Sequence, residues 1–371
     1  MVWGAWIESQ LDGVRADGRW RQTHSFDALG PTGLIDGRPV VSFASNDYLG
    51  LSAHPAVVGA AQEAAARWGT GATASRLIVG TRPGHSQLEA EIADWKACEA
   101  ALVFSSGYLA NLGLLSTLGG PGVTVFSDEL NHASIVDGCR LSRSAVRVYR
   151  HSDLDHLEQL LADAPGPALV VSDTVFSMDG DLAPLDGLGE CCVRHDALLV
   201  LDEAHAVLGP DPGSPGRGGP ETVRIGTLSK TLGSLGGWVA GSAGLVDLLV
   251  NRARPFIFTT ALTPADTAAA LAALGVLRSP EGEGLLGALR AAVERICAGH
   301  PSPIIPILLG PEARAIEAAA ALLQRGILVP AIRPPTVPPG SSRLRVTMSA
   351  THTESMIDRL LAALVELGLR P

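Results

Sequence analysis

Five short polar segments each follow an apolar run, and their side chains include types that bind phosphate, transfer protons or form covalent adducts. They are SSGY (105–108), DELNHAS (128–134), SDTVFSMDGD (172–181), LDEAH (201–205) and TLSK (227–230). Each has a structural explanation when taken alone, since Asp and Ser cap helices and Gly makes turns. At the ends of successive parallel strands, however, all five would meet at one edge of a sheet. We therefore predict a single site.

Lys230 is predicted to be the reactive residue of this site. It follows the apolar run that ends in Ile225, and a solitary lysine there would simply extend its stem toward water. Pyridoxal 5'-phosphate (PLP) would use all the groups present: a lysine, an acid for its ring nitrogen, a donor for its phenolic oxygen and amides for its phosphate. Asp202 suits the ring nitrogen, His205 the phenolic oxygen, and the SSGY turn the phosphate.

The elements that must position these side chains are apolar runs of strand length between about residues 100 and 241. These runs are ALVFSSG, VTVFSD, VRVY, ALVVSD, ALLVLDE, VRIGTLSK and GWVAGS, with helical or turn-like stretches between them. Several show no polar alternation, which is typical of strands covered on both faces. The predicted fold class is α/β, with a mostly parallel sheet sandwiched by helices.

The rest of the chain is predicted to form helices and a smaller α+β unit. Helical patterns occur at 82–98, 263–300, 312–325 and in the tail TESMIDRLLAALVELGL, while SPIIPILLG, GILVP and SRLRVTMSA are strand-like. The Pro/Gly-rich stretch 209–221 is predicted to be a loop within one unit. The predicted domains are an N-terminal helix and extension (1–44), a large PLP-binding domain (45–262) and a small C-terminal domain (263–371).

Composition excludes several classes of function. The 371 residues carry a formal net charge of -10 with no lysine or arginine run, so neither nucleic acid nor an anionic membrane is an expected partner. The amino terminus lacks a signal-peptide pattern and no stretch has the length of a membrane span. Five cysteines without C-x-x-C spacing indicate reduced thiols, no metal site and a cytoplasmic location. A dinucleotide site is disfavoured, because no G-x-G-x-x-G follows the early strands.

The ordered set SNDYLGL (45–51), SSGYLAN, NHAS, VFSMDGD, DEAH, TLSK and RLRVTMSA resembles the α-oxoamine synthase family of fold-type I PLP enzymes over essentially the whole chain. The resemblance implies condensation of an amino acid with an acyl thioester and loss of carbon dioxide. The segment AIRPPTVPPGSSRLR (331–345) looks most like the family members that join L-alanine to pimeloyl-CoA or pimeloyl-ACP. Siblings that use glycine or serine share the cofactor residues and are the alternative, with a noncatalytic subunit of this fold as a remote one.

The resemblance also implies a role for each motif residue. Lys230 would hold PLP and later move the substrate's α-proton, with Asp202 and His132 as the other catalytic residues. The residues implied to contact the cofactor or its phosphate are Gly107, Tyr108, His132, Ser177, Asp202, His205, Thr227, Lys230 and Thr260. Those implied to contact substrate are Arg345 and Asn46 for the amino-acid carboxylate, Arg21 and Thr336 for the acyl group, and His132. Thr260 would act across the interface of a homodimer with shared active sites.

Three positions need separate arguments. Arg345 is preferred to Arg343 as the carboxylate ligand, because Arg343 is expected to face the other side of the strand. Arg21 is selected only by the resemblance, since a solvated helix-end arginine would look the same. Ala206 follows the DEAH histidine where the family often has glycine, so the loop there is expected to differ, without loss of a catalytic group.

Overall fold

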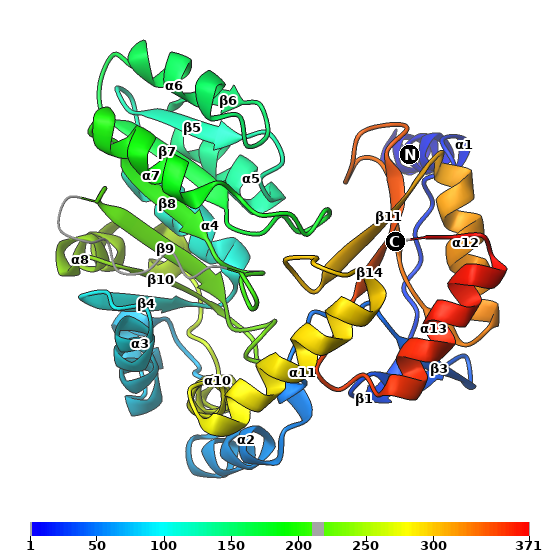
Figure 1. Cartoon of the computed structure of the whole chain (residues 1–371). Coiled ribbons are helices and arrows are strands. Elements are labelled where there is room, and N and C mark those ends of the chain that lie inside the picture. Colours follow the sequence, from blue (N-terminus) through cyan, green and yellow to red (C-terminus); the bar gives the residue numbers. More distant parts are fainter. Residues whose placement is uncertain (1, 210–218, 371) are drawn as a thin grey trace.

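The computed structural model describes residues 2–209 and 219–370. Figure 1 shows a large sheet flanked by helices on one side of the molecule and a smaller sheet-and-helix body on the other, with α10 (Pro264–Leu277) and α11 (Pro280–Ile296) at the junction below them. Most of the loop predicted at 209–221 lies outside the described residues.

The large sheet has seven strands in the order β4-β10-β9-β8-β7-β5-β6. All neighbouring strands pair in parallel except β10, which runs antiparallel to both β4 and β9. The predicted α/β fold with a mostly parallel sheet is therefore confirmed. The strands are β4 (Ala100–Phe104), β5 (Thr124–Asp128), β6 (Ala145–Tyr149), β7 (Ala168–Asp173), β8 (Leu198–Asp202), β9 (Thr222–Thr227) and β10 (Gly237–Gly241).

Both faces of this sheet are buried, which explains the continuous apolar runs. Along β4, Leu102 and Phe104 pack into one core while Ala101 and Val103 pack into another, as the two-residue period of a strand requires. Helices α4, α5, α8 and α9 contribute to the first core, α3 and α10 contribute to the second, and α6 and α7 cover the strands toward β6. Their bounds are α3 (Pro83–Trp95), α4 (Gly107–Leu118), α5 (Ala133–Ser142), α6 (Leu154–Ala162), α7 (Leu185–Arg194), α8 (Ala243–Arg252) and α9 (Arg254–Ile257).

The smaller body combines both ends of the chain. A three-stranded antiparallel sheet has the order β11-β14-β13, and a four-stranded sheet has the order β1-β2-β3-β12. Because β12 pairs in parallel with β3, the segment before residue 44 joins the C-terminal strands. The strands are β1 (Asp27–Leu29), β2 (Thr32–Ile35), β3 (Arg38–Ser42), β11 (Ile304–Gly310), β12 (Ile327–Leu328), β13 (Ala331–Ile332) and β14 (Ser342–Thr347), and the helices are α12 (Glu312–Gln324) and α13 (Glu354–Glu366).

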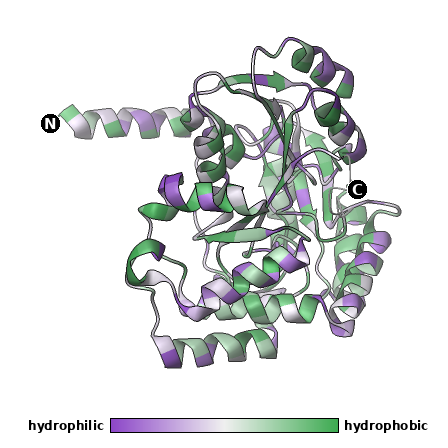
Figure 2. Ribbon diagram, turned by 90° about the vertical axis from the view of Figure 1, so that its left-hand side faces the viewer, coloured by the Kyte–Doolittle hydropathy of each residue, from purple (hydrophilic) through white to green (hydrophobic). Residues whose placement is uncertain are grey.

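The remaining elements lie at the periphery. Helix α1 (Val2–Ala16) projects from the body in Figure 2, and none of its described residues is buried. Helix α2 (Pro55–Trp68), the short helix η1 (Leu51–Ala53) and the π-helical turn η2 (Arg76–Gly80) complete the elements. Within the described residues, we find no helix with the length and apolar character that a membrane crossing requires.

Candidate active site

The polar segments that follow the strands meet at one edge of the large sheet. Asp202 ends β8, and its Oδ2 accepts a 2.7 Å hydrogen bond from Nδ2 of Asn111 on α4. Asp173 ends the neighbouring strand β7, and its Oδ2 accepts a 2.8 Å hydrogen bond from the backbone N–H of His132, the residue that caps α5. Parallel pairing of Asp173 with Asp202 keeps the two strand ends level.

Lys230 lies in the turn between β9 and β10, with its half-buried side chain directed into this cluster. Its Nζ is 2.9 Å from Nε2 of His205. Burial lowers the pKa of Lys230 to about 8, although the charges of Asp202 and Asp173 oppose this shift. A larger fraction of the amine is therefore neutral near pH 7 than for an ordinary lysine, and a neutral amine is the form that can attack a carbonyl or accept a proton.

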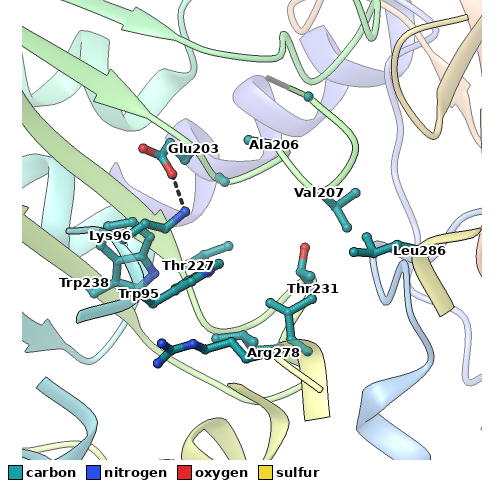
Figure 3. Close-up of a pocket in the computed structure, with 14 residues that line it drawn as sticks. Trp95, Lys96, Glu203, Ala206, Val207, Thr227, Thr231, Trp238, Arg278 and Leu286 are labelled. Carbon is teal, nitrogen blue, oxygen red and sulfur yellow. Dashed lines mark hydrogen bonds and ion pairs between the residues drawn. The ribbon is translucent and has the colours of Figure 1, made fainter. Parts of the chain in front are cut away.

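The sequence contains only one other lysine, Lys96, among 28 basic residues. Lys96 lines a cavity of about 260 Å³. Its Nζ pairs with Glu203 at 2.6 Å and lies 3.7 Å from the centre of the Trp95 ring, and Figure 3 shows these side chains together. Glu203 also pairs with buried Arg224. Because the Lys96 ammonium is held in this ion-pair cluster, Lys230 is the better candidate for covalent chemistry.

Asp202 and Asp173 form a pair of buried carboxyl groups with different surroundings. Asp202 accepts hydrogen bonds from Asn111 and, at 2.9 Å, from the backbone N–H of Ala204. Burial, and then the nearby charge of Asp202, raises the pKa of Asp173 well above its ordinary value. Burial next to Asp202 thus favours the protonated form of Asp173 more than in an ordinary aspartate.

Two histidines line the cluster, and the pKa of each is lowered. His132 accepts or donates a 2.8 Å hydrogen bond between its Nδ1 and Ser134 Oγ, and burial lowers its pKa. The pKa of His205 is well below its ordinary value, first because the ring is buried and then because of the charges of Lys230 and Arg345. His205 also lies 2.5 Å from the hydroxyl of fully buried Tyr48, so a neutral imidazole connects that phenol to the lysine.

Arg345 on β14 brings the smaller body into the site. Its Nη2 donates to Asn46 Oδ1 at 3.1 Å, and its Nε donates to the backbone oxygen of Ser177 at 2.5 Å. Asn46 Oδ1 also accepts from the Tyr48 hydroxyl at 3.2 Å, which links this arginine to His205. The site therefore combines a buried cation suited to a carboxylate with a lysine of lowered pKa.

The expectation that Arg343 faces the other side of the strand was wrong. Residues two apart on a strand share a face, and Arg343 indeed pairs with Asp179, two residues beyond the Ser177 carbonyl that holds Arg345. The two arginines differ in their partners. Arg343 is engaged by a carboxylate, whereas Arg345 contacts only neutral oxygen atoms in its hydrogen bonds within the described residues, and it remains the better carboxylate ligand.

The N-terminus of α4 packs closely against the end of β9 and the start of β10. Gly237 packs so closely that a Cβ there would lie 2.5 Å from the Gly107 backbone, and a Cβ on Gly107 would lie 3.3 Å from Thr227 Cβ. The Ser105 hydroxyl donates to the Thr260 carbonyl at 3.0 Å. The structure thus brings Gly107 and Thr227 together at a helix N-terminus, where N–H groups favour a phosphate.

Three predicted residues lie apart from this cluster. Tyr108 is 40% exposed, and its hydroxyl bonds to Asp137. Arg21 and Thr336 are both exposed, and Arg333 ties their segments together by donating to the carbonyls of Gly18 (2.6 Å) and Trp20 (2.9 Å). The structure therefore joins the segments that carry the two predicted acyl-substrate residues, and within the described residues neither side chain has a hydrogen bond to the Lys230 cluster.

Tyr48, Asn111 and Asp173 were not singled out from the sequence. All three occur inside quoted segments, and Asn111 ends SSGYLAN, four residues after Gly107 and one helical turn into α4. The sequence holds a further signal for Lys230 itself, because two lysines among 28 basic residues leave few candidates for a covalent role.

The sequence profile of the family "Aminotransferase class I and II" matches residues 38–364. The chain belongs to this family. An 8-amino-7-oxononanoate synthase from Anaeromyxobacter dehalogenans is 50% identical, with 97% of this chain and 94% of that protein covered. A serine palmitoyltransferase from S. paucimobilis with a bound PLP–myriocin aldimine has a TM-score of 0.91 at 28% identity, covering 98% and 97% of the two chains. An 8-amino-7-oxononanoate synthase from Francisella tularensis has a TM-score of 0.74 at 27% identity, covering 89% and 98%.

Proposed function

We propose that this protein condenses L-alanine with a pimeloyl thioester, either pimeloyl-CoA or pimeloyl-ACP, and releases carbon dioxide, free thiol and 8-amino-7-oxononanoate in biotin biosynthesis. The full-length identity of 50% to a protein named for that product carries the proposal. The high TM-score to serine palmitoyltransferase does not overturn it, because a shared fold does not determine the substrate.

The site fits PLP by the chemistry of its donors. Lys230 would hold the cofactor, Asp202 would pair with the ring nitrogen, and His205 would contact the phenolic oxygen. The phosphate would occupy the N-terminus of α4, beside Gly107 and Thr227. Further cofactor contacts are proposed for Tyr108, His132, Ser177 and, from the other subunit of a dimer, Thr260.

When bound, PLP supplies an electron sink that stabilises negative charge at the amino acid's α-carbon. Lys230 would move the proton at that carbon, for which its pKa of about 8 is suited. Arg345 and Asn46 would hold the substrate carboxylate in a fixed orientation, and Asp202 would keep the ring nitrogen protonated. Arg21 and Thr336 would contact the pimeloyl chain.

A homodimer is part of the proposal. Exposed apolar side chains at η2, Leu77, Ile78 and Val79, lie close to exposed Phe258, and Ser75 bridges to Thr260 in the same region. A second copy of the chain would cover this surface and bring Thr260 to the neighbouring phosphate. We also propose a cytoplasmic location, on the cysteine pattern of the sequence.

The test is thiol release by the purified, PLP-loaded protein. Pimeloyl-CoA and pimeloyl-ACP are each offered with L-alanine, glycine or L-serine, and palmitoyl-CoA is offered with L-serine because serine palmitoyltransferase shares the fold. We expect release with L-alanine and a pimeloyl thioester only. Preference for glycine or serine would assign a sibling activity, and no release with any pair would support a noncatalytic subunit.

A further inference from the structure

His151 lies between two carboxylates outside the Lys230 cluster. Its Nδ1 is 3.0 Å from Asp128 Oδ1, and its Nε2 is 2.7 Å from Asp181 Oδ2. A neutral imidazole has one N–H and could donate to only one of them, whereas an imidazolium donates to both. The geometry therefore calls for the charged ring. Hydrogen bonding to Asp128, and then to Asp181, raises the pKa of His151 to about 10, which agrees with this assignment.

The two carboxylates belong to separate parts of the molecule. Asp128 ends β5, inside the large sheet, and Asp181 lies on residues 175–182, which we call the 175–182 loop. A bridge between Val175 and Leu182 closes this loop. The His151 ring also meets the Phe176 ring edge-on, with centroids 4.4 Å apart. His151 therefore ties the loop to the edge of the sheet.

The anchor on the sheet side is itself well held. Asp128 accepts hydrogen bonds from the backbone N–H groups of Leu130 and Ser152, both at 2.9 Å. The backbone N–H of His151 donates to Glu129 Oε1 at 2.9 Å. The carboxylates of Asp128 and Asp181 thus contact the ring itself and Glu129 contacts the backbone beside it, so one imidazolium partly neutralises the carboxylates at the ring.

The opposite side of the 175–182 loop holds the two arginines of β14. The Ser177 carbonyl accepts from Arg345 Nε at 2.5 Å, and Asp179 pairs with Arg343. Figure 1 shows the segment after β7 extending from the large sheet toward β11 and β14. The 175–182 loop therefore connects His151 with the guanidinium of Arg345, which lies in the site.

We propose that His151, as an imidazolium, is a positioning residue for Arg345. By fixing the 175–182 loop, it sets the Ser177 carbonyl and so the orientation of the guanidinium. Bidentate binding of a carboxylate depends on that orientation, and small misplacements of binding groups have large kinetic effects. The inference rests on the proposed function, which gives the amino-acid carboxylate to Arg345.

The test compares His151→Gln with His195→Gln. His195 is a matched control: its Nε2 is 2.7 Å from Glu158 Oε1 and its side chain is 22% exposed, against 23% for His151, but it lies at the end of α7. For each variant we would measure the KM for the amino acid and for the acyl thioester, with whichever amino acid the wild-type protein accepts. Hydrogen exchange at the amides of Phe176 and Gly180, which are bonded within the loop, reports the loop without needing turnover.

We expect His151→Gln to raise the amino-acid KM by about tenfold or more, leave the acyl-thioester KM nearly unchanged and speed exchange at both loop amides. His195→Gln should do none of these. His151→Arg, which keeps a positive charge and two donors, should restore much of the amino-acid KM. Equal changes in both KM values, or unchanged loop exchange in His151→Gln, would overturn the inference.

Failure of this inference can be distinguished from failure of the proposed function. If the wild-type protein rejects L-alanine but accepts glycine or serine, the proposed substrate is wrong while the same KM comparison still decides the role of His151. If the wild-type protein accepts L-alanine and His151→Gln behaves like His195→Gln, only the positioning role fails.

Discussion

At the scale of single residues, the site depends on one arginine whose hydrogen bonds leave it available for a carboxylate. Arg345 is 5% exposed and is held by Asn46, Ser177 and Thr347. Its planar guanidinium can bind a carboxylate through two parallel hydrogen bonds, which a lysine ammonium cannot reproduce.

Arg345→Lys should therefore raise the KM for L-alanine by roughly 10- to 100-fold, with a much smaller effect on the KM for the pimeloyl thioester. Steady-state kinetics with each substrate varied in turn would measure the split. Arg343→Lys is the control, because Asp179 already pairs with Arg343. Equal effects of Arg345→Lys on the two KM values would show that Arg345 does not bind the amino-acid carboxylate.

The pH dependence of PLP capture follows from the lowered pKa of Lys230. Burial lowers the pKa of Lys230 to about 8, and only the neutral amine attacks an aldehyde. The rate at which cofactor-free protein captures PLP should therefore increase with pH and level off above about pH 8, as measured by stopped-flow absorbance. A rate that still climbs steeply toward pH 10 would show that the amine has an ordinary pKa.

Much of the site was predictable at this scale, but its connections were not. The positions of Lys230 and Asp202 followed from motifs at strand ends, and Asn46 was selected by the family resemblance. The links from Tyr48 to His205 and from Asn111 to Asp202 join residues 157 and 91 positions apart. No local pattern reports such pairings, because they depend on how the strands are ordered in the sheet.

At the scale of secondary structure elements, the approach of α4 to β10 shapes the proposed phosphate site. Gly237 opens β10 against the Gly107 backbone, with no room for a side chain between them. Apolar runs predicted all seven strands of the large sheet. The antiparallel direction of β10 was not predicted, although residues 228–236, which link it to β9, are too few for the crossover that a parallel strand needs.

Gly237→Ala should push the start of α4 away from Thr227, because the added Cβ would lie 2.5 Å from the Gly107 backbone. We expect a loss of about 1–3 kcal/mol in the free energy of unfolding and weaker PLP binding, measured by denaturant titration and by equilibrium titration with PLP. Gly244→Ala, on α8 where a Cβ meets no atom within 4 Å, should change neither. Unaltered PLP affinity in Gly237→Ala would contradict the proposed phosphate site.

At the scale of the whole molecule, the two bodies meet at the site, since Arg345 and Asn46 come from outside the large sheet. The predicted boundaries at residues 44 and 262 remain a prediction. Pairing of β3 with β12 was not foreseen, because β12 has only two residues and its partner lies almost 300 positions earlier. The proposed dimer adds a further level, at which Thr260 would serve the neighbouring subunit.

Ile78→Asp should shift the protein toward monomers and weaken PLP binding, because Ile78 is 74% exposed within the apolar surface assigned to the second copy. Sedimentation velocity and PLP titration would measure the two effects. Val365→Asp is the control, since Val365 is 77% exposed on α13, away from η2. A wild-type protein that is monomeric and binds PLP fully would contradict the shared site.

The central claim is that Lys230 is the residue that carries the cofactor, and the sequence makes it directly testable because there are only two lysines. Purified protein would be incubated with PLP, reduced with borohydride and digested, and the modified lysine identified by mass spectrometry. The account predicts a stable adduct on Lys230, none on Lys96, and no adduct in a folded Lys230→Ala variant. Labelling of Lys96 in preference to Lys230, or labelling that survives in Lys230→Ala, would contradict it.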